Sequence, residues 1–204
     1  MKKAALLLAL APALVHADTP KQPPGTPAAP AAAPPVPPKA PTPPKPSAEI
    51  SELAAGMAGT WKCKGKAMTP TGETSATSTI VNKVDLDKWF IQTSFSGKLG
   101  TWTYKFTSYI GFNTVEQKFT RFLVDNMGGT EVSTAVAIDH AMGGKWGMHW
   151  EGEAHEATKG FSGSNLMKTR ETEAYSNSGL DLTGEMSVDG GKTWQSAYTV
   201  SCKK

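Results

Sequence analysis

The sequence of 204 residues carries a formal net charge of +3, with 39% hydrophobic and 19% charged residues. A charge so close to balance, without a run of Lys or Arg in the globular part, excludes a strong attraction to nucleic acid or to an anionic membrane. The sequence contains no recognisable catalytic motif, and it therefore indicates architecture and compartment rather than a chemical activity.

Residues 1–17 have the pattern of an export signal. Two lysines precede an apolar segment at 4–15, and Ala17 ends a small-residue cleavage pattern. A membrane span needs about 20 apolar residues, so we expect a cleaved signal peptide rather than an uncleaved anchor. Cleavage leaves nineteen basic and eighteen acidic residues, and the mature protein is predicted to be secreted or periplasmic, without membrane insertion.

Residues 18–47 differ in composition from the rest of the chain. Thirteen of the fifteen prolines lie between Pro20 and Pro46, among Ala, Thr and Lys. Such a segment cannot bury a core and favours extended polyproline II structure. It is predicted to be a disordered, semi-rigid linker, with a docking peptide at 43–46 as the alternative.

A single domain is predicted at 48–204, and a short helix begins it. Ser47 is the expected N-cap, and the helix should end near Met57, before Gly59. One face of this helix is apolar, formed by Ile50, Leu53, Ala54 and Met57. We expect the helix to close one mouth of a barrel, or to lie beside it as an N-terminal flap.

The first strand, at 59–68, alternates between two faces. Trp61, Cys63 and Ala67 share one face, and three lysines share the other. Nine further strands are predicted at 74–84, 89–96, 101–110, 115–124, 130–139, 145–154, 163–173, 179–188 and 193–202. Their spacing and turn signals predict an all-β fold, a closed antiparallel up-and-down barrel of about ten strands with a short N-terminal helix.

Alternation also assigns inward faces to several strands. These faces include Ile91, Thr93 and Phe95; Trp102, Tyr104 and Phe106; Val132, Thr134 and Val136; Trp146, Met148 and Trp150; and Trp194, Tyr198 and Val200. The strands at 74–84 and 163–173 are rich in Ser, Thr, Asn and Lys. Part of the barrel interior, or one of its walls, is therefore expected to be polar.

The two cysteines, Cys63 and Cys202, both fall on inward faces of the first and last strands. These strands are antiparallel neighbours in a barrel with an even number of strands, within disulfide reach. Exported proteins occupy compartments in which such pairs oxidise. We expect a disulfide that joins the two ends of the domain, with two free buried thiols as the alternative.

These features resemble those of a known superfamily. The short helix, the strand that opens with Gly-Thr-Trp at 59–61 and the Gly-rich hairpin at 189–194 resemble the calycins, the lipocalin-like and fatty-acid-binding-like barrels. More narrowly, they resemble an uncharacterised family of secreted bacterial proteins, a domain of unknown function. The resemblance covers 48–204 and implies a barrel, but no known ligand. Calycins carry a late Arg or Lys over the first-strand Trp; here the last strand has no Arg, and Lys203 lies near the end of the chain.

Other groups of polar residues do not predict catalysis. His149, Glu151, Glu153 and His155 share one strand face at a spacing that suits zinc or copper. The opposite face holds tryptophans, so this row should point to water, and we expect no metal and no other cofactor. The segment at 160–164 lacks the Gly-x-Ser-x-Gly spacing of a nucleophilic serine. We therefore predict a protein that is not an enzyme.

Arg121 and Arg170 are the only arginines beside nineteen lysines. Because Arg binds carboxylates through a bidentate fork, we hypothesise that they hold a ligand headgroup or an internal Glu; surface pairs are the alternative. The predicted ligand contacts are Trp102, Tyr104, Arg121, Trp150 and Arg170. The predicted function is binding of a small amphiphilic or hydrophobic ligand inside an exported barrel. The alternative is a non-catalytic envelope scaffold whose barrel is filled by its own side chains.

Overall fold

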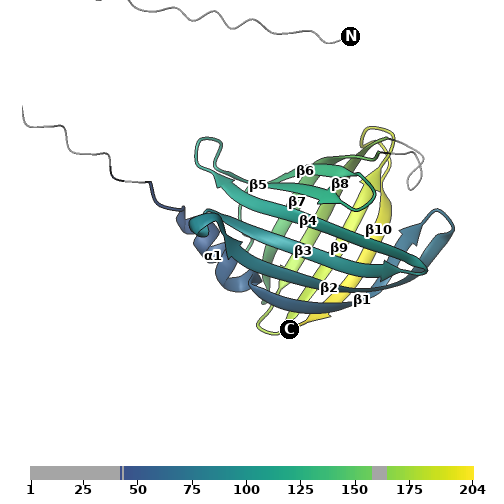
Figure 1. Cartoon of the computed structure of the whole chain (residues 1–204), viewed down its shortest axis with the longest axis horizontal. Helices are drawn as coiled ribbons and strands as arrows, with labels where there is room; N and C mark the ends of the chain where they lie inside the picture. The colour runs from purple at the N-terminus through teal and green to yellow at the C-terminus, as the bar shows by residue number, and fades with distance from the viewer. Residues whose placement is uncertain (1–41, 43, 158–164) are drawn as a thin grey trace, which may run out of the picture. The chain divides into compact units, whose positions relative to one another are not determined.

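The computed structural model describes residues 42, 44–157 and 165–204, and its main body is a β-barrel (Figure 1). One helix and ten strands make up the described part: α1 (Ala48–Met57), β1 (Gly59–Thr69), β2 (Gly72–Asp85), β3 (Phe90–Leu99), β4 (Trp102–Asn113), β5 (Lys118–Asp125), β6 (Thr130–Ala135), β7 (Trp146–His155), β8 (Leu166–Tyr175), β9 (Gly179–Ser187) and β10 (Gln195–Lys203). A short 3₁₀ turn, η1 (Leu86–Lys88), joins β2 to β3. The predicted signal peptide and nearly all of the predicted linker lie outside the described residues.

Each strand pairs in antiparallel fashion with the next, and β10 pairs with β1, which closes the barrel. The predicted fold class, a closed antiparallel barrel of ten strands behind a short helix, is confirmed. Within the part of the chain that the structure describes, no helix is long and apolar enough to cross a membrane.

The first and last strands are joined covalently at the closing seam. Cys63 and Cys202 are direct partners in the β1–β10 register, and their sulfur atoms are bonded at 2.03 Å. The alternation of β1 accounts for this, because it turns Cys63 inward together with Trp61 and Ala67. The predicted disulfide is confirmed.

Helix α1 covers one end of the barrel (Figure 1). Its N-cap is Ser47, as expected, and the Ser47 Oγ accepts a hydrogen bond from the backbone N–H of Ile50 at 3.3 Å. Its apolar face, formed by Ile50, Leu53, Ala54 and Met57, is buried in the core of the barrel. The carbonyl of Met57 at the helix end accepts hydrogen bonds from Trp61 Nε1 and Asn82 Nδ2, which fixes the helix to β1 and β2.

Two of the predicted inward faces are wrong. In β6 the inward residues are Glu131, Ser133 and Ala135, whereas Val132 is 51% exposed. The physical reason is that Glu131 and Ser133 meet the buried Arg121 of the neighbouring strand, and this outweighs the burial of a valine. The strand also ends at Ala135, so that Val136 lies in the following loop.

The second error is in β10 and has a different cause. The register between β9 and β10 shifts between Ser196 and Tyr198, because Ala197 is an extra residue in a β-bulge. A one-residue insertion reverses the side-chain alternation beyond it. Tyr198 and Val200 therefore point inward as predicted, but Trp194 lies outside the barrel, where Arg170 stacks on its ring.

Candidate functional site

The interior of the barrel contains a cavity of about 270 Å³. It extends from Met57 of α1 to Met127 in the turn between β5 and β6. One wall is aromatic: the Phe95 and Phe106 rings stack at 4.8 Å between centroids, and Tyr104 lies about 6 Å from both. These three residues lie on the inward faces of β3 and β4, which the sequence alternation predicted correctly.

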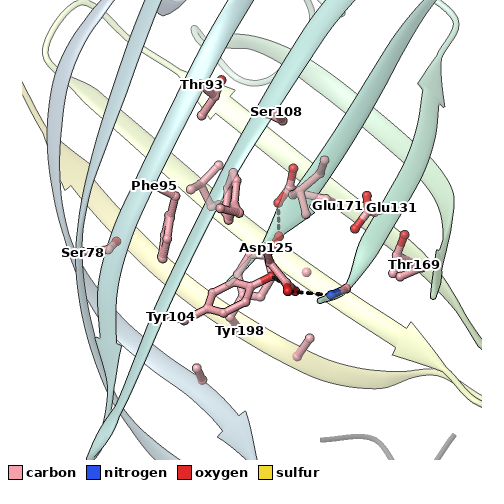
Figure 2. A pocket seen from close by; sticks show the side chains of 18 of the residues that line it. Ser78, Thr93, Phe95, Tyr104, Ser108, Asp125, Glu131, Thr169, Glu171 and Tyr198 are labelled. Atoms are coloured by element: carbon pink, nitrogen blue, oxygen red, sulfur yellow. Dashed lines mark hydrogen bonds between the residues drawn. The ribbon is translucent and has the colours of Figure 1, made fainter. Parts of the chain in front are cut away.

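A second wall is polar and is built around Arg121 of β5. The guanidinium of Arg121 donates to Glu171 Oε1 at 2.5 Å, to Glu131 Oε1 at 3.1 Å and to Glu173 Oε1 at 3.3 Å. Its Nε donates to Ser133 Oγ at 3.0 Å. Figure 2 shows Glu131 and Glu171 on the side of the cavity opposite Phe95. One buried cation thus holds three carboxyl groups, supplied by β6 and β8.

Other side chains complete the hydrogen bonds of this cluster. The Tyr175 hydroxyl donates to Glu173 Oε2 at 2.8 Å, and the Tyr198 hydroxyl donates to Glu171 Oε2. The Trp150 ring packs against Arg121, with 4.8 Å between the guanidinium carbon and the ring centroid. Arg121 is therefore fixed by ion pairs on one side and by a cation–π contact on the other.

Burial shifts the protonation of the cluster. Loss of solvent, followed by repulsion from Glu171, raises the pKa of Glu173 to about 8, although Arg121 and Tyr175 act in the opposite direction. Burial also opposes the charge of Arg121, but the carboxylates of Glu171, Glu131 and Glu173 outweigh it and hold the pKa of Arg121 above its ordinary value. Near neutral pH the cluster therefore holds both a cation and a protonated carboxyl group.

A further acid, Asp125, lies at the end of β5. Its Oδ2 accepts a hydrogen bond from the Tyr104 hydroxyl at 3.1 Å, and its Oδ1 accepts from the backbone N–H groups of Met127 and Gly129 (Figure 2). Burial, together with the neighbouring Asp125, raises the pKa of Tyr104 well above its ordinary value. Tyr104 therefore stays a neutral donor that is already engaged by a carboxylate.

Two buried polar atoms on the cavity wall have no partner among the described residues. They are Ser108 Oγ, in a residue that is 1% exposed, and Asn82 Oδ1, in a residue that is 3% exposed. The amide nitrogen of Asn82 is already bound to Met57, so the atom left over is an acceptor. Buried polar atoms are rarely unpaired, and these two point to a polar group that enters the cavity.

The five predicted contact residues occupy different places. Tyr104 and Trp102 border the cavity, with Trp102 exposed near the start of β4. Arg121 is buried in the polar wall, and Trp150 packs behind it. Arg170 lies on the outside, where its side chain is 43% exposed and its Nε donates to Glu185 Oε2 at 2.6 Å. The structure thus brings Tyr104 and Arg121 to one cavity and places Arg170 in a surface pair.

The carboxyl groups were missed by the sequence reasoning. Glu171, Glu173 and Tyr175 share the inward face of β8, and Glu131 has the same orientation in β6. The sequence did contain a usable signal. Glu171 and Glu173 have the same parity as the apolar residues Met167 and Tyr175, whereas Arg170 and Thr172 have the opposite parity. Read with period 2, they predict a polar interior on β8.

The row of candidate metal ligands lies outside the barrel. His149, Glu151, Glu153 and His155 are all exposed on the outer face of β7, the orientation that the sequence predicted. His149 lies within hydrogen-bond distance of Thr172 and Asp139. In residues 42, 44–157 and 165–204 no group of three or more His, Cys, Asp or Glu side chains is arranged to hold a metal ion.

The fold and the site define a class, a closed ten-stranded antiparallel barrel with a partly polar internal cavity. Among solved structures, the crystal structure of Rv2717c from M. tuberculosis is similar, with 13% sequence identity and a TM-score of 0.63 over 78% of this chain and 99% of that chain. At that identity the likeness shows the fold alone. No protein-family model and no curated protein matches the sequence.

Proposed function

We propose that this protein is a non-enzymatic barrel that binds a small amphiphilic or hydrophobic ligand in its interior. The observation that carries the proposal is the cavity of about 270 Å³. Ligand pockets commonly measure roughly 300–1,000 Å³ and combine apolar walls with a few polar groups. The cavity lies just below that range, which favours a small ligand over a long lipid.

The two walls of the cavity suit an amphiphile. Phe95 and Phe106 offer an apolar surface, and the Arg121 cluster with Asp125 offers polar groups on other strands. Ser108 and Asn82, whose side-chain oxygens have no partner among the described residues, line the same cavity. A ligand with one apolar and one polar part would satisfy both kinds of surface.

We further propose that the barrel is of calycin type. In support, the ammonium group of Lys204 lies 4.8 Å from the centroid of the buried Trp61 ring at the start of β1. A late cation over the first-strand Trp is the feature that calycin resemblance implies, and Lys204 supplies it rather than Lys203.

Export is part of the proposal. The disulfide between Cys63 and Cys202 supports an oxidising compartment, because such bonds are rare in the cytosol. N-terminal sequencing of the protein from its own host should find Asp18 as the first residue. A protein that keeps residues 1–17 and has two free thiols would contradict export.

Binding is tested with the neutral fluorescent probe N-phenyl-1-naphthylamine. Ala76 is buried on the cavity wall of β2 and faces Gly65, whereas its neighbour Thr77 points outward. Ala76→Phe should fill the cavity and abolish saturable probe fluorescence, and Thr77→Phe should retain it, with circular dichroism and thermal unfolding as controls for folding. Absence of saturable binding in the unmodified protein, or equal binding by both variants, would refute the proposal.

The second candidate function is the envelope scaffold with a filled barrel. It is favoured by one observation, that Arg121 spans the interior and finds its partners within the chain. The same titration separates the two functions, because a scaffold requires no uptake of the probe. Ala76→Phe would then overpack the filled barrel and lower its thermal midpoint, with no probe fluorescence to lose.

A further inference from the structure

The polar wall of the cavity has more hydrogen-bond acceptors than free hydrogen-bond donors, and this favours a ligand that brings donors. Arg121 was the candidate to hold an anionic headgroup. Four of its N–H groups are already donated, to Ser133, Glu131, Glu171 and Glu173. An anionic ligand would have to displace a carboxylate from this cation and would then lie beside that displaced charge.

The tyrosine donors of the polar wall are engaged as well, whereas the indole N–H of Trp150, behind Arg121 and away from the cavity lining, has no partner among the described residues. The hydroxyl groups of Tyr104, Tyr175 and Tyr198 donate to Asp125, Glu173 and Glu171. Four inward acids, Asp125, Glu131, Glu171 and Glu173, line the cavity beside a single inward Arg among the described residues, and only the three glutamates contact that Arg. Each carboxylate offers about four acceptor positions. Asp125, Glu131 and Glu171 therefore keep acceptor capacity after every tyrosine and arginine contact is counted, whereas Glu173 carries a proton near neutral pH.

Independent evidence for a missing donor comes from the two orphaned atoms. Ser108 Oγ and Asn82 Oδ1 are buried on the cavity wall without a partner among the described residues. The Asn82 oxygen can only accept, and a serine hydroxyl accepts as readily as it donates. Both atoms would be satisfied by a group that brings several N–H donors into the cavity.

The aromatic wall favours the same kind of group. Phe95, Phe106 and Tyr104 form a cluster of rings within about 6 Å of one another, and ring faces attract cations. Tyr104 joins this wall to Asp125 through its hydroxyl. The carboxylates would attract the charge of an ammonium group, and the aromatic rings would make dispersion contacts with its apolar substituent.

We infer that the ligand is a small hydrophobic amine, bound as its ammonium ion against the carboxylates of Glu171 and Asp125, with its apolar part along Phe95 and Phe106. The inference rests on the proposed function, since it names the class of ligand for the same cavity. It replaces the sequence-based hypothesis of an anionic headgroup held by Arg121.

The test compares three molecules of one length, octylamine, octanol and octanoate, as competitors for bound N-phenyl-1-naphthylamine at pH 7. A charge-assisted hydrogen bond inside the cavity should make octylamine bind about tenfold or more tightly than octanol, with octanoate the weakest. Glu171→Gln should remove the preference for octylamine over octanol. Glu153→Gln, the same change at an exposed position of β7, should leave the preference unchanged.

The outcomes separate this inference from the proposed function. If the probe does not bind, the ligand-binding function itself falls. If the probe binds but octanoate competes as well as octylamine, or all three molecules compete equally, the cationic ligand is refuted and the binding function stands. Should Glu171→Gln fail to fold, the comparison of the three molecules on the unmodified protein decides alone.

Discussion

Replacement of Glu173 by Gln should remove a pH dependence from the stability of the barrel. Glu173 is 5% exposed, accepts a hydrogen bond from Tyr175 at 2.8 Å and lies 3.3 Å from Arg121. Its burial, and after that its neighbour Glu171, raise its pKa to about 8 from an ordinary value of 4.5. The native protein therefore keeps a proton at this side chain that the unfolded chain loses.

The sign of the effect follows from this difference in bound protons. Between pH 4.5 and about 8 the folded state binds the proton and the unfolded state does not. The free energy of unfolding should therefore fall as the pH rises through this window, by at most about 1.4 kcal/mol per pH unit for one proton. The stabilisation is fully present below pH 4.5 and is lost above pH 8.

Urea unfolding at several pH values between 5 and 8 measures this slope. Gln has no titrating group, and its amide oxygen can keep one of the two hydrogen bonds that Glu173 accepts, from Tyr175 at Oε2 or from Arg121 at Oε1. Glu173→Gln should gain stability relative to the unmodified protein as the pH rises, whereas Glu153→Gln, at an exposed site, should follow the unmodified protein. Parallel pH profiles for Glu173→Gln and the unmodified protein would refute the reasoning.

Arg121→Leu should destabilise the barrel by about 3–5 kcal/mol in urea unfolding at pH 7, because it leaves three inward carboxyl groups, one of them fully buried, without their cation; an unchanged midpoint would mean that the cluster contributes nothing to folding. Joint replacement of Cys63 and Cys202 by Ala should lower the free energy of unfolding by on the order of 5 kcal/mol, since the disulfide closes a loop across 139 residues. A loss no greater than that of a conservative surface substitution would contradict this chain-entropy estimate. Gly147→Ala should lower the thermal midpoint, at a cost of about 1–3 kcal/mol, because its Cβ would lie 1.8 Å from the backbone oxygen of Glu173; a melting curve that matches the unmodified protein would show that β7 and β8 can separate without cost.

The strand pattern could be predicted because it depends on local alternation. In β1 the sequence Trp61-Lys62-Cys63-Lys64 leaves little doubt about which face is buried, and the parity of Cys63 and Cys202 leads to the disulfide. In β6 the same rule fails, since Val132 would be the inward residue by hydrophobicity alone. Its exposure depends on a partner in another strand, Arg121, which needs Glu131 and Ser133 beside it.

The binding site was less accessible to sequence reasoning for a related reason. A lone Arg in a strand indicates a carboxylate partner but does not say whether that partner belongs to the chain or to a ligand. By this criterion the sequence did not distinguish Arg121 from Arg170. Arg121 lies inside the barrel with three glutamates, whereas Arg170 lies outside with Glu185. The bulge at Ala197 likewise leaves no signal that distinguishes the orientation of Trp194 from that of Tyr198.

The bond between β1 and β10 also determines how the protein would respond to mechanical tension. A pull on the two ends of the chain reaches Cys63 after only four residues of β1, and Cys202 lies two residues from the C-terminus. The force then passes directly through the sulfur–sulfur bond, and the 138 residues between the two cysteines bear none of it. Of the described residues before Cys63, those of α1 and the start of β1 would peel away and lengthen. Loss of Met57 would open one end of the cavity, whereas the polar cluster around Arg121 would stay between its strands. Reduction would convert this short, inextensible path into one that unravels strand by strand.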